Sequence, residues 1–143
     1  MKNKWLKIIC LFIVLLIAPF FIVPIYNNIR LNIFAQQLFQ IELPPTTVLI
    51  RTDKEIGHWG GGNSLDFSCS LEVYSEFDRD ELLQYYSAYT FCGANKEKGG
   101  DVTVHVSLKS ELGYLEYSAD DRNIYIIYLQ ASGYSTAFDI RGH

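Results

Sequence analysis

The sequence predicts an α+β protein, with a single N-terminal transmembrane helix followed by an antiparallel sheet of about five strands and one packed helix. Three patterns predict this fold: an uncharged apolar run at residues 8–25, alternation of apolar and polar residues at 65–74 and 102–109, and a helix-start signal at Asp78. Alternating strands leave one apolar face, and a helix packed on that face closes a single core.

The apolar run is long enough to cross a bilayer as a helix. Its eighteen residues rise about 27 Å, close to the ~30 Å thickness of the hydrocarbon layer. Trp5 and Tyr26 lie about 31 Å apart along such a helix, where interfacial aromatic residues are expected. Three lysines precede the run and one basic residue follows it closely. The positive-inside rule therefore predicts a cytoplasmic N-terminus and an exported C-terminal part.

A cleaved signal peptide is the main alternative to this anchor. Cleavage needs small residues just before the cut site, but the run ends in Val23, Pro24, Ile25 and Tyr26. We therefore expect a single-pass protein of the cell membrane. Residues 1–7 are then cytoplasmic, 8–26 span the membrane, 27–43 form a juxtamembrane helix or linker, and 44–143 form the extracytoplasmic domain.

The exported part contains patterns for one further helix and several strands. Pro44 and Pro45 end the juxtamembrane helix. Asp78 and Glu81 have capping-box spacing, which predicts a helix from 78 to about 91 that Gly93 helps to end. Glycine-rich segments at 58–63 and 96–101 predict loops. Strands are predicted at 46–53, 65–74, 102–108, 112–118 and 124–130, with an edge strand at 136–140.

The charge distribution excludes some partners. The chain has a formal net charge of −4, but residues 30–143 contain nine Lys and Arg against sixteen Asp and Glu, a charge of −7. An acidic domain argues against nucleic acid, whose binding depends on neutralising phosphates, and against docking on anionic lipid heads. The expected partners are membrane lipid around residues 8–26 and a protein or envelope component.

Two cysteines lie in the exported part, and their state is left open. A bridge between Cys69 and Cys92 would close a loop of ~24 residues and stabilise the fold by roughly 3 kcal/mol. The alternative is two free thiols that pack as small hydrophobic groups.

The loop His58-Trp59-Gly60-Gly61-Gly62 contains the candidate contact residues. Trp59 is a large apolar ring in an exposed loop, and His58 lies beside it, so we assign both as weak binding candidates. The three histidines are His58, His105 and His143, and they lack the spacing of zinc ligands. We therefore expect no metal and no cofactor.

No set of acid, base, nucleophile and metal ligand converges in the sequence, which favours a non-catalytic binding module at the cell envelope. Two alternatives remain. A pilin-like structural subunit also joins an N-terminal apolar helix to a β-rich head, but prepilins normally carry a glycine before the processing site and an early glutamate. Here no acid precedes Glu42. The other alternative is a small envelope enzyme that uses Cys92 or His58.

The order of elements resembles a group of small uncharacterised membrane-anchored bacterial proteins with an extracytoplasmic α+β domain. The resemblance rests on the lysine-led anchor, on Glu42-Leu43-Pro44-Pro45-Thr46 after the juxtamembrane helix, and on the loop Gly60-Gly61-Gly62-Asn63. The helix that begins at Asp78 completes it. It implies no activity, so it transfers no functional residue.

Overall fold

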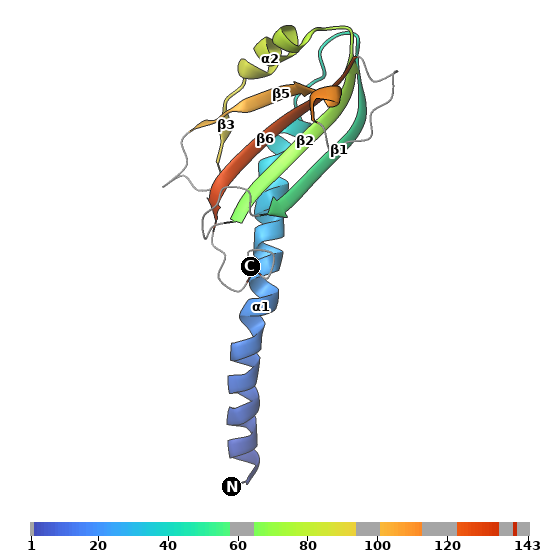
Figure 1. Cartoon of the computed structure of the whole chain (residues 1–143). Helices are drawn as coiled ribbons and strands as arrows, with labels where there is room; N and C mark the ends of the chain where they lie inside the picture. Colours follow the sequence, from blue (N-terminus) through green and yellow to red (C-terminus); the bar gives the residue numbers. More distant parts are fainter. Residues whose placement is uncertain (1, 58–64, 94–100, 113–122, 135–138, 140–143) are drawn as a thin grey trace.

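The computed structural model describes residues 2–57, 65–93, 101–112, 123–134 and 139, and shows a long helix with a sheet at its C-terminal end (Figure 1). Its elements follow in chain order. They are α1 (Lys2–Phe39), β1 (Thr47–Gly57), β2 (Leu65–Ser75), α2 (Arg79–Ser87), β3 (Phe91–Cys92), β4 (Asp101–Val102), β5 (Val104–Leu108), a 3-10 turn (Lys109–Glu111) and β6 (Ile124–Tyr134).

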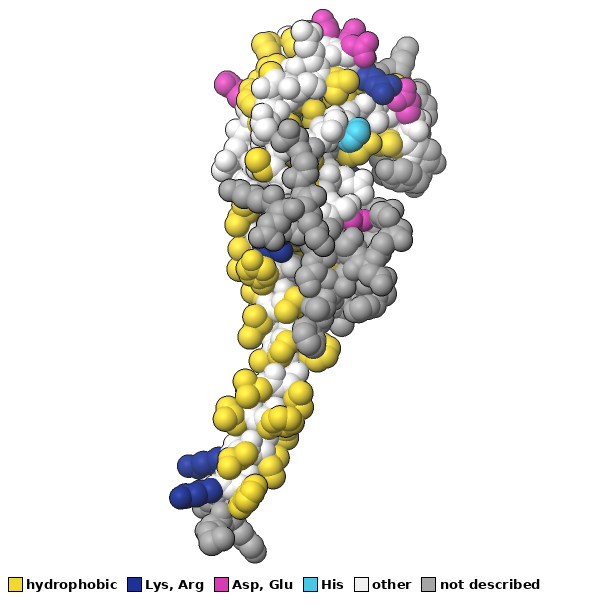
Figure 2. Space-filling model, turned by 90° about the vertical axis from the view of Figure 1, so that its left-hand side faces the viewer, with side chains coloured by type: hydrophobic (Ala, Val, Ile, Leu, Met, Phe, Trp, Pro, Cys, Tyr) yellow, Lys and Arg dark blue, Asp and Glu magenta, His cyan; other side chains and the backbone are white. Residues whose placement is uncertain are grey.

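Helix α1 is continuous and has two halves with different surroundings. Pro19 and Pro24 lie inside it, and the apolar side chains of its N-terminal half are exposed (Figure 2). This helix is long and apolar enough to cross a membrane, by length and composition. In the C-terminal half, buried residues recur every three or four positions and form one stripe against the sheet: Leu31, Phe34, Ala35 and Leu38. The predicted transmembrane and juxtamembrane helices are therefore one helix.

The C-terminal end of α1 lies within the expected juxtamembrane segment 27–43. The helix ends at Phe39, and the rest of that segment is not helical. A turn follows, in which the Ile41 N–H donates to the Leu38 carbonyl at 3.2 Å. Pro44 is buried, and proline disfavours helical geometry at the residue before it, so the chain leaves the helix before the two prolines.

The four-stranded sheet has the order β1-β2-β6-β5, and all its neighbouring strands are antiparallel. The predicted antiparallel sheet is confirmed. Strands β1 and β6 extend beyond the predicted 46–53 and 124–130. Nearly all of the predicted strand 112–118, and the predicted edge strand 136–140 apart from Asp139, lie outside the described residues.

One face of the sheet carries the core. Alternate residues of β2 are buried on this face: Leu65, Phe67, Cys69, Leu71 and Val73. The rings of Phe34 and Phe67 have centroids 6.4 Å apart, which places α1 directly on β2. One buried cluster contains residues of α1, α2 and the sheet, so both helices cover the same face. The sequence predicted one packed helix, which is α2. The other helix on this face is the C-terminal half of α1, which continues from the predicted transmembrane segment.

Helix α2 begins as predicted and ends early. Its capping box is present: Asp78 Oδ1 accepts from the Glu81 N–H at 2.9 Å, and Glu81 Oε2 accepts from the Asp78 N–H at 2.9 Å. The helix ends at Ser87 rather than near Phe91, because Phe91 is buried in β3 and pairs with Val102 of β4. Strand pairing, a tertiary contact, therefore overrides the continuation of the helix.

Candidate interaction surface

Among the described residues, no helix or strand covers the face of the sheet opposite the two helices, and most side chains on that face are polar. In Figure 1 the sheet lies in front of α1, so this open face is turned toward the viewer. The register of the strands places the residues that alternate with the core on it: Arg51, Asp53 and Glu55 of β1, Ser68, Ser70 and Glu72 of β2, Ile126, Tyr128 and Gln130 of β6, and His105 and Ser107 of β5. We call this set the open face.

An imidazole and a phenol stack at the centre of β5 and β6. His105 and Tyr128 are direct cross-strand partners. Their ring centroids lie 5.0 Å apart, and the angle between the ring planes is 22°. His105 is exposed and Tyr128 is half-buried. Cross-strand aromatic pairs stabilise a sheet. This pair also presents a flat ring surface with polar edges.

A cluster of three charges lies beside this pair of rings. The carboxylate of Glu72 lies 3.4 Å from Arg51 Nε and 3.1 Å from Lys109 Nζ. Glu72 is only 8% exposed, whereas the Arg51 side chain is 61% exposed. One buried negative charge thus meets two positive charges. The three side chains sum to one positive charge, and Asp53 and Glu55 of β1 add two carboxylates to the same face.

The predicted contact residues His58 and Trp59 lie outside the described residues, so the structure does not test that prediction. His105 has the polar-face position that alternation predicted. Arg51, Glu72 and Lys109 were missed as a group, because their meeting depends on strand register. The available signal was weak: each is a charged residue in or next to a predicted strand.

Cys69 and Cys92 are free thiols in the structure, which is the second of the two alternatives that the sequence left open. Cys69 is buried beneath the helices, while the Cys92 side chain is exposed. Burial raises the pKa of the Cys69 thiol to about 12, although a hydrogen bond with the backbone of Leu129 opposes the shift. Cys69 therefore packs as a small hydrophobic group.

Cys92 is held through its backbone by α1. Its N–H donates to Gln37 Oε1 at 2.8 Å, and its carbonyl accepts from Gln37 Nε2 at 3.0 Å. The side-chain amide of Gln37 thus makes the pair of hydrogen bonds with the Cys92 backbone that a neighbouring strand would otherwise make. Because α1 covers the face opposite His105, the structure brings neither Cys92 nor Cys69 to that imidazole.

The described residues contain no group of three His, Cys, Asp or Glu side chains arranged to hold a metal ion. The open face presents hydroxyls, one amide, stacked rings and a charged cluster, groups of the kind that contact polar partner surfaces.

Comparison of the chain with protein-family models, with curated proteins and with solved structures finds no match.

Proposed function

We propose that this protein is a single-pass membrane protein that holds a small α+β domain outside the cytoplasmic membrane for non-catalytic contact with a protein or envelope component. The observation that carries the proposal is the continuity of α1. Its exposed apolar half runs without a break into the half that forms the core. Water disfavours so long an apolar surface, and a bilayer accommodates it.

The charge pattern supports the orientation. Figure 2 shows Lys and Arg side chains near the N-terminal end of α1 and Asp and Glu side chains on the domain at the other end. Basic residues remain on the cytoplasmic side.

Cys92 offers a direct test of orientation. It is exposed, whereas Cys69 is buried and Cys10 lies within the proposed span. A membrane-impermeant maleimide is therefore expected to label the full chain in intact spheroplasts. Cys92→Ser should abolish labelling, and Cys69→Ser should leave it unchanged. Labelling that requires lysis would overturn the orientation.

The open face is the proposed contact surface. A photocrosslinking amino acid at Gln130, which is exposed on this face, is expected to capture one discrete partner in intact membranes. The control is the same amino acid at Gln84, which is exposed on α2. Absence of an adduct at Gln130, or the same adduct at both positions, contradicts the assignment.

A pilin-like structural subunit is the second candidate. It is favoured by one observation: the C-terminal half of α1 packs on an antiparallel sheet while the N-terminal half projects from it (Figure 1). The absence of an acid before Glu42 weighs against it. N-terminal sequencing decides, because a subunit of this class is trimmed before assembly, whereas the proposed anchor retains the cytoplasmic residues 1–7.

A further inference from the structure

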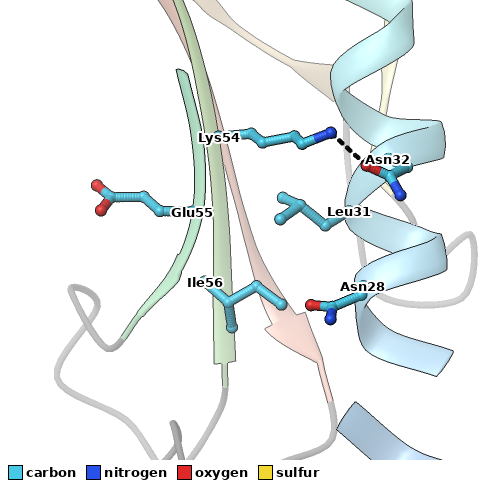
Figure 3. A pocket seen from close by; sticks show the side chains of 6 residues that line it. All are labelled: Asn28, Leu31, Asn32, Lys54, Glu55 and Ile56. Atoms are coloured by element: carbon cyan, nitrogen blue, oxygen red, sulfur yellow. Dashed lines mark hydrogen bonds between the residues drawn. The ribbon is translucent and has the colours of Figure 1, made fainter. Parts of the chain in front are cut away.

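A pocket of about 370 Å³ lies between α1 and β1. Figure 3 shows Asn28, Leu31 and Asn32 on the helix side, and Lys54 and Ile56 directed toward them from the strand. Glu55 belongs to the same stretch of β1, but its carboxylate points away from the helix (Figure 3). The volume lies within the range of small-molecule sites, about 300–1,000 Å³.

The pocket lies just beyond the apolar run. Asn28 and Asn32 rise about 4.5 Å and about 10.5 Å past Ile25 along the helix. The headgroup layer on each side of a bilayer is about 5–7 Å thick, judged from the total and hydrocarbon thicknesses. If residues 8–25 fill the hydrocarbon, the pocket opens at the level of the lipid headgroups and reaches slightly above them.

The polar groups in the pocket are donors suited to a phosphate. Lys54 Nζ donates a hydrogen bond to Asn32 Oδ1. That bond occupies the amide oxygen of Asn32 and leaves its N–H groups as donors, and the ammonium keeps further N–H groups. Among the described lining residues, Lys54 supplies the positive charge, and lysine binds phosphate as a point charge.

The apolar residues and the overall charge narrow the class of ligand. Leu31 and Ile56 offer carbon contacts beside the donors, which match the glycerol and upper acyl carbons of a lipid. The exported part has a charge of −7, from nine basic and sixteen acidic residues, and this disfavours an anionic headgroup. A zwitterionic headgroup brings a phosphate together with its own cation.

We propose that this pocket binds the phosphate of a zwitterionic phospholipid headgroup, of the phosphatidylethanolamine type, from the bilayer that α1 enters. The inference rests on the membrane anchor of the proposed function. A bound headgroup would tie β1 to the membrane surface and so set the tilt of the open face.

The test uses native mass spectrometry of the full chain, released from detergent micelles that contain phosphatidylethanolamine. The wild type is expected to retain one lipid. Lys54→Gln removes a charged hydrogen bond and is expected to reduce retention about tenfold or more. Lys54→Arg keeps the cation and should retain lipid. Arg79→Gln makes the same charge change on α2, where the side chain is exposed, and should match the wild type.

Two competitors identify what is recognised. Diacylglycerol with the same acyl chains lacks the phosphate and should not be retained. Inorganic phosphate at millimolar concentration should not displace the phospholipid. Equal retention by Lys54→Gln and wild type, equal retention of diacylglycerol, or displacement by inorganic phosphate each overturns the proposal.

Resistance of the chain to carbonate extraction from membranes separates the two proposals. An extractable chain contradicts the anchor itself. A chain that resists extraction, but retains lipid equally well as wild type and as Lys54→Gln, contradicts only the headgroup site.

Discussion

Asn27 and Asp139 lie 112 positions apart in the sequence and form a buried hydrogen bond, with Asn27 Nδ2 donating to Asp139 Oδ2 at 2.7 Å. Tyr26, one residue earlier, is 57% exposed, whereas Asn27 is 2% exposed. Asn27 therefore marks the point at which α1 enters the domain. The bond attaches Asp139 to the helix there.

Asn27→Ala is expected to destabilise the domain by about 1–3 kcal/mol, because it leaves a buried carboxylate oxygen without its donor. Thermal unfolding of the full chain in detergent micelles measures the change. Gln36→Ala changes an exposed polar side chain of the same helix and should stay within about 0.5 kcal/mol of the wild type. Equal losses in the two variants would show that the buried bond contributes nothing specific.

Tyr85 and Tyr86 are adjacent tyrosines, and removal of their hydroxyls is expected to change the stability of the fold in opposite directions. Tyr86 Oη is buried with no hydrogen-bond partner among the described residues. Tyr85 Oη donates to the Glu42 carbonyl at 2.9 Å. Tyr86→Phe should therefore stabilise the fold by about 1 kcal/mol, and Tyr85→Phe should destabilise it by about 0.5–1.5 kcal/mol. Both changes keep the rings, so denaturant midpoints compare the hydroxyls alone, and shifts of the same sign would contradict this account.

Local sequence patterns were sufficient to predict the helices and strands that residues close in the sequence determine. The alternation at 65–74 matches β2, and the capping box at Asp78 and Glu81 starts α2. The errors lie where distant contacts decide. Phe91 has helical spacing in the sequence, but its pairing with Val102 places it in a strand. The juxtamembrane helix expected after the apolar run is not among these errors, because α1 continues through both segments without a break.

The candidate surface was less predictable than the fold. Alternation places His105 on a polar face, but only register places Tyr128 opposite it. The same is true of Arg51 and Glu72, which become partners beyond an irregularity in the pairing of β1 with β2. A polar residue with a distant partner, such as Asn27, carries no local sign of that partner.

Glu72 and Glu111 allow a comparison of a buried and an exposed ion pair. Glu72 pairs with Arg51 and Lys109 while its side chain is 10% exposed, whereas Glu111 lies 3.8 Å from Arg79 with both side chains more than half exposed. Glu72→Gln should cost about 1–3 kcal/mol, because Lys109 then loses a buried counter-charge. Glu111→Gln should cost less than about 0.5 kcal/mol. Thermal unfolding in low and high salt provides the check, since salt should weaken the exposed pair more.

The buried thiol of Cys69 is expected to make the fold less stable as the pH rises into the alkaline range. Burial raises its thiol pKa from 9.0 to about 12, so the folded state holds this proton more tightly than the unfolded state. The stabilisation is complete below pH 9 and is lost as the pH rises toward 12. At pH 10 the loss from this group, relative to neutral pH, is about 1.4 kcal/mol. Burial also raises the pKa of Tyr86, which adds to the fall at higher pH.

Cys69→Ala is expected to be less stable than the wild type at pH 8, because it leaves a small cavity, but its stability should fall less between pH 9 and pH 10.5. Cys92→Ala removes an exposed thiol and should keep the wild-type dependence. Denaturant midpoints measured at half-unit steps of pH give the slopes. Parallel curves for wild type and Cys69→Ala would contradict the assignment, because they would mean that the buried thiol exchanges its proton as it does in the unfolded chain.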